Sequence, residues 1–380
     1  MAEKREVMHL YIHIPFCKQA CHYCDFHFST NTSGKRQMVE AIAKEIELRR
    51  SYLGSEQIET IYFGGGTPSV LSREELDILL NTASKHFSIA GNAEITLEAN
   101  PDDLDRARLE NFAQAGINRL SIGIQSFNEN HLRFLNRVHS ATDAMQCVKL
   151  AQEVGIHNIS IDLIYAIPAA DDQILQDDLQ KAFALNVAHI SAYCLTIEPQ
   201  TVFGNWLKRK KIQPIDEEFA ARQFEILIKT LAENGYEQYE ISNFARNGQY
   251  SRHNSSYWQQ HPYLGVGPSA HSYNGASREF NISNNAKYVE AIAAHVIPAT
   301  FEQLSAEDQT NEYVLTGLRT KWGVNVSKLQ MLSEGKFFTA NSNELLTMKK
   351  NGWIREESET LLLTESGKLF ADRIASDLFI

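Results

Sequence analysis

Stretches typical of β-strands alternate with stretches typical of helices through the first 200 residues of this 380-residue chain. The strand segments are rich in β-branched and aromatic residues, and the segments between them show the helical spacing of apolar residues. The expected strands are 8–16, 58–66, 93–101, 118–126, 157–168 and 188–199, and the expected helices are 35–52, 72–86, 104–115, 141–154 and 171–185. This order predicts an α/β protein whose six β/α units form a partial TIM-like barrel.

Beyond about residue 200 the alternation stops, which predicts further parts of different construction. We expect a helix over 216–234, a short strand over 236–242 and a loop-rich stretch to 280. Helices over 305–320 and 342–350, two short β-like runs and a last helix predict a smaller, mainly helical, winged-helix-like C-terminal domain. The expected parts are a barrel over 1–200, a barrel extension over 201–298 and a C-terminal domain over 299–380.

The charge balance argues against a nucleic-acid-binding protein. The formal net charge is −11 and the isoelectric point is about 5.7, whereas phosphate neutralisation requires a basic surface. The one basic run, 208–211, is expected to be a solvated helix end, with an anionic membrane surface or acidic partner as the alternative. Acidic residues in the C-terminal domain, such as Glu356 and Glu365, favour packing or partner docking there over DNA binding.

The cysteine count and the hydropathy point to the cytoplasm. Five cysteines is an odd number, and no signal-peptide-like stretch precedes Cys17, so a disulfide framework is not expected. No run of about 18 apolar residues is present, which predicts no transmembrane segment. Any membrane contact is expected to be peripheral.

Three of the cysteines, Cys17, Cys21 and Cys24, are spaced C-x3-C-x2-C and lack a fourth cysteine nearby. A closed zinc or iron–sulfur site held only by protein takes four ligands. Three thiolates therefore suit a four-iron cluster in which one iron keeps an open position. A zinc site completed by His22 or His27 and a coincidental triplet are the alternatives.

Polar residues follow consecutive expected strands, and the carboxyl ends of parallel strands meet at one edge of a barrel. They favour one shared pocket and comprise the cysteines, Gly64–Thr67, Glu98, Asn100, Gln125 and Asp162. The glycines explain a tight turn equally well as a ligand loop. A structural salt bridge is the alternative for Glu98. Gln125, Arg137 and Asp162 are each explained by structure alone, but together they could line a nucleoside site.

In combination, these motifs resemble the radical S-adenosylmethionine superfamily. The resemblance rests on the cysteine loop with Tyr23 before its last cysteine, the GGGTP run, the IDLIYAIP strand and their order, and it spans almost the whole chain. It implies that the three cysteines hold a [4Fe-4S] cluster, that S-adenosylmethionine chelates the fourth iron, and that reduction can split its sulfonium to a radical. The positions that match cofactor-contacting residues are Tyr11, Phe26, Gly65, Gly66, Thr67, Glu98, Gln125, Arg137 and Asp162.

The matching branch contains oxygen-independent coproporphyrinogen III dehydrogenases (HemN) and haem chaperones (HemW), and the chain resembles the chaperones more. The dehydrogenase loop resembles C-x3-C-x2-C-x-C, but here position 26 is phenylalanine and only 16 residues precede Cys17. The HNSSYW segment matches the H-N-x-x-Y-W signature of the chaperones. By this resemblance haem would bind at His253, Asn254, Tyr257 and Trp258, with His253 as axial ligand. His261 and His271 are weaker candidates, and a surface histidine beside aromatic residues is the structural alternative.

We therefore expect a cytoplasmic haem chaperone that carries a [4Fe-4S] cluster, S-adenosylmethionine and haem. It would pass haem to an acceptor protein that the sequence does not identify. A membrane-associated acceptor, a peripheral position at the inner membrane face and a homodimer are left open, and no catalytic residue is assigned. The alternatives are oxidative decarboxylation of coproporphyrinogen III and a structural zinc protein that binds another small molecule.

Overall fold

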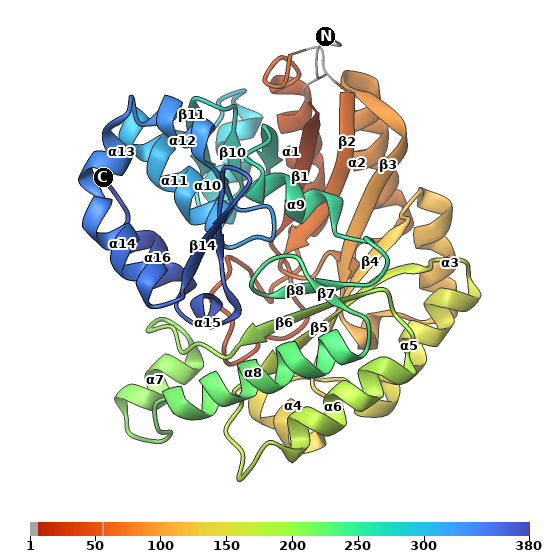
Figure 1. Cartoon of the computed structure of the whole chain (residues 1–380). Helices are drawn as coiled ribbons and strands as arrows, with labels where there is room; N and C mark the ends of the chain where they lie inside the picture. The colour runs from red at the N-terminus through yellow and green to blue at the C-terminus, as the bar shows by residue number, and fades with distance from the viewer. Residues whose placement is uncertain (1–6, 55–56) are drawn as a thin grey trace.

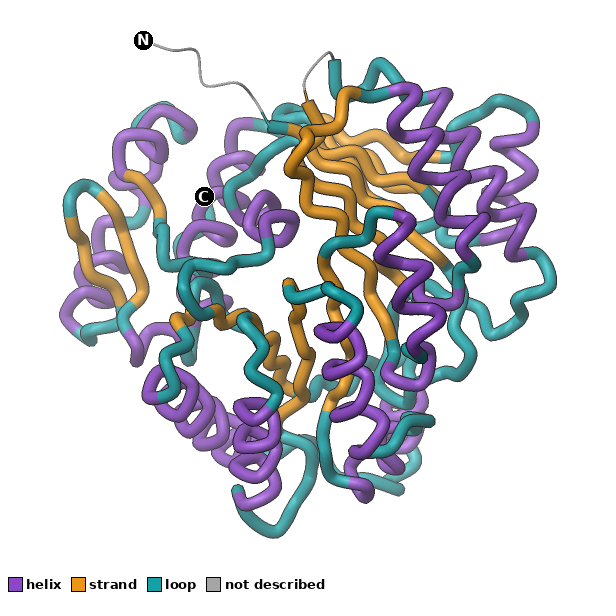
Figure 2. Tube along the Cα trace, turned by 90° about the vertical axis from the view of Figure 1, so that its right-hand side faces the viewer, coloured by secondary structure: helices purple, strands orange, loops and turns teal. Residues whose placement is uncertain are grey.

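A computed structural model describes residues 7–54 and 57–380. Its centre is a continuous curved sheet of 12 strands in the order β12-β11-β10-β9-β1-β2-β3-β4-β5-β6-β8-β7 (Figures 1 and 2). The six expected strands form its parallel middle: β1 (Met8–Ile14), β2 (Gln57–Gly65), β3 (Ser88–Ala99), β4 (Arg119–Gln125), β5 (Asn158–Tyr165) and β6 (His189–Cys194). The predicted α/β class and parallel strands are confirmed.

Helices cover the outer face of these strands (Figure 1). The five predicted ones are α1 (Lys35–Leu48), α2 (Arg73–His86), α3 (Arg106–Ala115), α5 (Ala141–Glu153) and α6 (Gln173–Ala184). Local sequence sets several ends: Ser72 and Ser140 form capping boxes with Glu75 and Asp143. One short helix, α4 (Glu129–Leu135), was not predicted.

The two faces of the parallel strands differ in chemistry. Leu10 and Ile12 on β1 and Ile122 on β4 are fully buried members of the core between the sheet and the outer helices. The alternating positions, such as Tyr11 on β1 and Ser121 on β4, carry polar groups instead. Since side chains alternate between faces along a strand, this places polar groups inside the barrel.

The stretch after residue 200 is more regular than predicted. It contains α7 (Val202–Lys208), α8 (Glu217–Glu233), β7 (Glu237–Gln238), β8 (Asn243–Ala245), α9 (Arg252–Trp258), β9 (Tyr263–Val266), β10 (His271–Tyr273), β11 (Ser277–Asn281), α10 (Asn285–Ala293) and β12 (Ala299–Gln303). The expectation of a loop-rich stretch to 280 was wrong, because short strands there extend both edges of the sheet. β9 pairs parallel to β1, and β12, which pairs with β11, lies beyond the expected boundary at 298.

The C-terminal part has its own apolar core, which includes Val314, Phe337 and Leu378. Its elements, blue in Figure 1, are α11 (Ala306–Leu318), β13 (Val324–Asn325), α12 (Val326–Leu332), α13 (Lys336–Ala340), α14 (Ser342–Lys350), β14 (Ile354–Glu357), β15 (Thr360–Leu363), α15 (Glu365–Lys368) and α16 (Ala371–Asp377). Their antiparallel sheet has the order β13-β15-β14, and the predicted helices and short strands are present. Across residues 7–54 and 57–380, no helix has the length and apolar character that crossing a membrane requires.

Candidate functional site

The three clustered cysteines lie on one loop after β1. The Cys17 N–H donates to the Ser29 carbonyl over 3.1 Å, and the Ser29 N–H donates to the Pro15 carbonyl over 2.9 Å. The Cys24 N–H points back to the Cys21 carbonyl at 3.4 Å. The loop is thus folded on itself at the carboxyl end of β1, and all three thiols are free.

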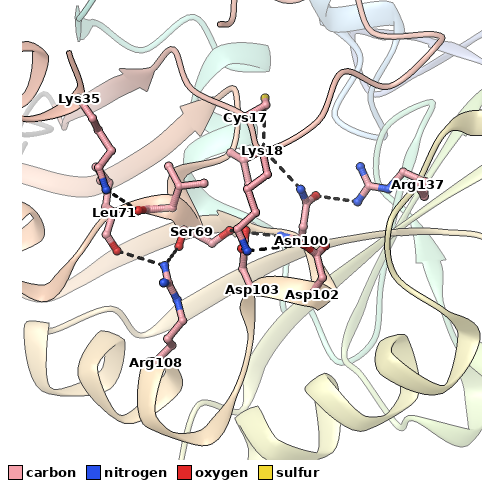
Figure 3. A network of polar contacts seen from close by, with 12 residues as sticks. Cys17, Lys18, Lys35, Ser69, Leu71, Asn100, Asp102, Asp103, Arg108 and Arg137 are labelled. Carbon is pink, nitrogen blue, oxygen red and sulfur yellow. Dashed lines mark hydrogen bonds and ion pairs between the residues drawn. The ribbon is translucent and has the colours of Figure 1, made fainter. Parts of the chain in front are cut away.

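Side chains from neighbouring strand ends donate hydrogen bonds to two of the sulfurs. Thr67 Oγ1 lies 3.3 Å from Cys17 Sγ, and Arg137 Nη1 lies 3.3 Å from Cys21 Sγ. Asn100 connects the two donors, since its amide donates to Thr67 Oγ1 and accepts from Arg137 Nη2 at 2.6 Å (Figure 3). Donors aimed at sulfur favour the thiolate, which is the form that binds metal.

A second polar network holds the start of the loop. Lys18 forms ion pairs with Asp102 and Asp103, and Asp103 also accepts a hydrogen bond from Ser69 Oγ at 2.7 Å (Figure 3). Arg108 donates to the Ser69 carbonyl. Sequence reasoning missed these residues, whose partners are brought together only by the turns after β2 and β3.

The cysteine thiols lie in surroundings that oppose their ionisation. Burial raises the pKa of Cys17 to about 11 and that of Cys24 to about 12, so the thiolates need a cationic partner. Within the described parts of the chain, no three His, Cys, Asp or Glu side chains converge as the ligands of one metal ion would. His22 Nδ1 is bonded to the Phe134 carbonyl and His27 Nε2 to Asn285 Oδ1. These two histidines, considered as fourth ligands of a zinc site, therefore each have one ring nitrogen held by the protein.

The glycine run fits between β1 and the barrel interior because it has no side chains. A Cβ on Gly64 would lie 2.9 Å from Tyr11 Cε2, and one on Gly66 would lie 2.7 Å from the Phe16 carbonyl oxygen. Gly65 has a φ of +105°, which favours glycine. Its N–H donates to Glu98 Oε2 over 3.2 Å, so this donor is engaged by the protein itself.

Two carboxylates lie inside the barrel beside this run. Glu98 accepts a hydrogen bond from the Tyr62 hydroxyl at 2.8 Å, and Asp162 accepts one from Ser121 Oγ at 3.2 Å. Burial raises the pKa of Glu98 to about 7 and that of Asp162 to about 6. The salt bridge considered for Glu98 is absent from the ion pairs of residues 7–54 and 57–380. Buried carboxylates of this kind are suited to a cationic ligand.

Gln125 and Arg137 converge on the end of β4. Gln125 has a φ of +67° where the β4–β5 register shifts, and a Cβ on Gly123 would meet its amide at 2.8 Å. Arg137 Nη2 donates to the Gly123 carbonyl over 2.7 Å. Sequence reasoning missed Tyr62 and Ser121, although each occupies an alternating polar position on a strand that was predicted.

A cavity of about 570 Å³ opens beside the cysteine loop. The loop, β1, the segment 257–278 and α11 line it with Tyr11, His13, Asp25, Phe26, His27, Tyr257, Gln260, His261, Tyr263, Ser269, His271, Tyr273, Arg278, Glu312 and Thr316. Two of the residues matched to cofactor contact, Tyr11 and Phe26, thus line this cavity, whereas Arg137 is not among its lining residues. The phenyl ring of Phe26 is 68% exposed.

The HNSSYW segment forms α9, and His253 lies behind the cavity rather than in it. Its side chain is 0% exposed. Its Nδ1 is 2.6 Å from Thr60 Oγ1, and its Nε2 is 2.8 Å from the Tyr257 hydroxyl. Both nitrogens are therefore engaged, and axial ligation by His253 does not fit this arrangement, because an iron ligand needs an accessible lone pair.

The other three residues of the segment have separate positions. Tyr257 lines the cavity. The Asn254 N–H donates to the N-cap Ser251 Oγ, and the Arg319 guanidinium lies 5.4 Å from the centre of the Trp258 ring. The structure therefore brings Tyr257 to the cavity, whereas Asn254 and Trp258 are not among its lining residues.

Comparison with known proteins gives full-length matches. Residues 11–182 match the radical SAM superfamily, and residues 304–370 match the HemN C-terminal domain. The haem chaperone HemW of Bacillus subtilis is 33% identical over 96% of this chain and 97% of its own length, and that of Escherichia coli is 39% identical over 69% of each. The structure of coproporphyrinogen III oxidase (HemN) from Escherichia coli, described as a radical SAM enzyme, superimposes with a TM-score of 0.85 and 21% identity over 99% of this chain and 90% of that one.

Proposed function

Because this chain belongs to the radical SAM superfamily and to the HemW family within it, we propose that it is a haem chaperone that binds haem and passes it to an acceptor protein. The similarity to haem chaperones over nearly the whole chain carries this proposal. The cavity supports it, since its volume lies within the range of about 300–1,000 Å³ for small-molecule sites. Tyr257 of the HNSSYW segment connects that segment to the cavity wall.

The cysteine loop is proposed to hold a [4Fe-4S] cluster through Cys17, Cys21 and Cys24. Thr67 and Arg137 would stabilise the bound thiolates by the hydrogen bonds described above. S-adenosylmethionine would lie over the loop, with Glu98 and Asp162 offering carboxylates and the run Gly64–Gly66 leaving room for it. When bound, the cluster and S-adenosylmethionine supply one-electron reduction and a cleavable sulfonium.

The affinity for S-adenosylmethionine is expected to rise with pH through about 7. Below this pH Glu98 is protonated, because burial raises its pKa to about 7, and a neutral carboxyl does not attract a cationic ligand. In reconstituted protein the dissociation constant should fall roughly tenfold between pH 6 and pH 8. Equilibrium dialysis measures it, and Glu98→Gln should bind more weakly and lose this step. An affinity that is constant or falls with pH would remove Glu98 from the site.

Two assays separate the chaperone from the dehydrogenase. The chaperone should bind haem, seen as a Soret band, and should leave coproporphyrinogen III unchanged when reduced S-adenosylmethionine-loaded protein is incubated with it. Conversion to protoporphyrinogen IX with consumption of S-adenosylmethionine would show that the protein is a coproporphyrinogen III dehydrogenase and would refute the chaperone function. Failure to bind haem would refute the chaperone function directly.

The acceptor and the location are proposals on more limited support. The acidic chain with an exposed basic run at 208–211 would suit a cytoplasmic protein that meets a membrane-associated acceptor peripherally. This basic run begins with the last residue of α7 and is exposed, as expected from the sequence. Co-purification of haem-loaded protein with membranes, reversed by salt, would test the peripheral contact.

A further inference from the structure

Histidine side chains line the cavity beside the cysteine loop but not a second large cavity formed by the described residues. The second, of about 540 Å³, is lined by groups such as Phe134, Leu195 and Phe219 and has no histidine in its lining. The first contains His13, His27, His261 and His271. A haem-iron ligand is therefore to be sought among these four side chains.

The four imidazoles differ in what their ring nitrogens already contact. His13 has both nitrogens engaged, by the Tyr11 hydroxyl at 3.1 Å and the His27 carbonyl at 3.0 Å. His27 Nε2 is held by Asn285 Oδ1 at 2.7 Å. His261 stacks on the His9 ring with centroids 5.8 Å apart. Each of these rings is thus already held by groups of the protein.

His271 is placed differently. It begins β10, its side chain is exposed in the cavity, and its ring stacks on Phe280 across the β10–β11 pair with centroids 5.7 Å apart. Among the described residues, neither of its ring nitrogens has a hydrogen-bond partner. Burial and the nearby Arg278 lower its pKa, which keeps the imidazole in the neutral form that binds iron.

The surrounding walls suit a flat, apolar ligand with anionic groups. Tyr257 packs edge-on to Tyr263 at 4.6 Å, and Tyr263 lies 6.4 Å from Tyr273. Such rings offer apolar faces to a porphyrin. Arg278 lies in the same lining and is paired with Glu312, so it can share its guanidinium with a propionate.

We infer that His271 is the axial ligand of the haem iron and that His253 is a positioning residue that acts through Tyr257. This inference rests on the proposed haem binding. His253 holds the Tyr257 hydroxyl from behind while Thr60 holds His253, and Thr60 also contacts His9 Nδ1 at 2.9 Å. This chain of contacts holds Tyr257 against Tyr263 of β9, the strand beside β10, without placing the His253 imidazole in the cavity.

Haem titration of the full-length protein tests the assignment, with the Soret band and the electron paramagnetic resonance spectrum of the ferric form as readouts. His271→Ala should change the spectrum and lower the affinity at least about tenfold. Added imidazole should restore the wild-type spectrum in this variant, because it can occupy the space of the missing ligand. His157→Ala, which changes an exposed histidine that lines neither cavity, is the matched control and should leave both readouts unchanged.

His253→Ala and Tyr257→Phe should both weaken binding and keep the wild-type type of spectrum, and their effects should not add in the double variant. Tyr257→Phe keeps the test decisive if His253→Ala fails to fold. An unchanged spectrum in His271→Ala would overturn the inference while haem binding stands. The inference would also be overturned if the spectrum changed instead in His27→Ala or His261→Ala, or if it changed in His253→Ala and added imidazole restored it. Absence of any Soret band in the wild type would refute the haem-binding function together with the inference.

Discussion

Alanine at Cys17, Cys21 or Cys24 is expected to abolish the iron–sulfur cluster. Anaerobically reconstituted wild-type protein should contain about four irons and four sulfides per chain, and each variant should fall to background. The expected loss is complete because a cubane attached at three points has no spare protein ligand. His22 Nδ1 and His27 Nε2 are each already bonded to another group of the protein.

Cys147→Ala is the matched control. Cys147 is also a buried free thiol, but it lies on α5 and donates to the Ala144 carbonyl. This variant should keep the full iron and sulfide content and the visible absorbance of the wild type. Normal cluster content in any one of the loop variants, or stoichiometric zinc without sulfide in the wild type, would contradict the assignment.

The parallel strands could be predicted because the residue types of each strand are sufficient to identify it without knowledge of its partners. Buried parallel strands read as runs of β-branched residues, and the helices between them show caps such as Ser72 and Ser140. The helix α4 was missed because it spans only seven residues and most of them are polar. The strands β8–β11 were missed because they are short and because β9 finds its partner, β1, about 250 residues earlier in the chain. The residue pattern within a short segment does not indicate a pairing with a strand so far away in the sequence.

The site could be predicted only as far as strand topology determines it. Carboxyl ends of parallel strands share one edge, so Thr67 and Asn100 could be expected near the cysteines, and the structure places them there. The position of His253 could not be predicted, because the sequence gives the residue types of α9 but not which side of this short helix faces the sheet. The cavity histidines come from β1, the cysteine loop and the segment 257–278, which only the fold brings together.

Loss of the Glu45 carboxylate is expected to destabilise the protein by about 3–5 kcal/mol. Glu45 is fully buried on α1 and accepts hydrogen bonds from the Tyr288 hydroxyl at 2.5 Å, the Gly267 N–H at 2.8 Å and Asn281 Nδ2 at 2.8 Å. It also contacts Arg49 at 3.4 Å. Glu45→Ala leaves four buried donors without this acceptor, and each unsatisfied donor carries a desolvation cost.

Two further variants provide reference values for the loss of stability in Glu45→Ala. Tyr288→Phe removes one donor and keeps the carboxylate, so it should cost only about 1–2 kcal/mol. Glu40→Ala removes an exposed pair with Arg36 on the same helix and should cost less than about 1 kcal/mol. Urea unfolding followed by circular dichroism measures the free energies of unfolding. A loss in Glu45→Ala no larger than that in Glu40→Ala would contradict the argument.

The effect of Glu45→Ala should also be unevenly distributed over the fold. Gly267 and Asn281 belong to the segment that continues the sheet beyond β1. This segment also contains His271, which lines the cavity. Because Glu45 bonds Gly267 and Asn281 to α1, hydrogen exchange should increase first in β9–β11 and least in β3–β5. Haem affinity should then fall in Glu45→Ala while the cluster content stays unchanged, since the cysteine loop is held separately by Thr67 and Arg137. Equal acceleration of exchange in both regions would mean that Glu45 supports the whole barrel rather than this segment.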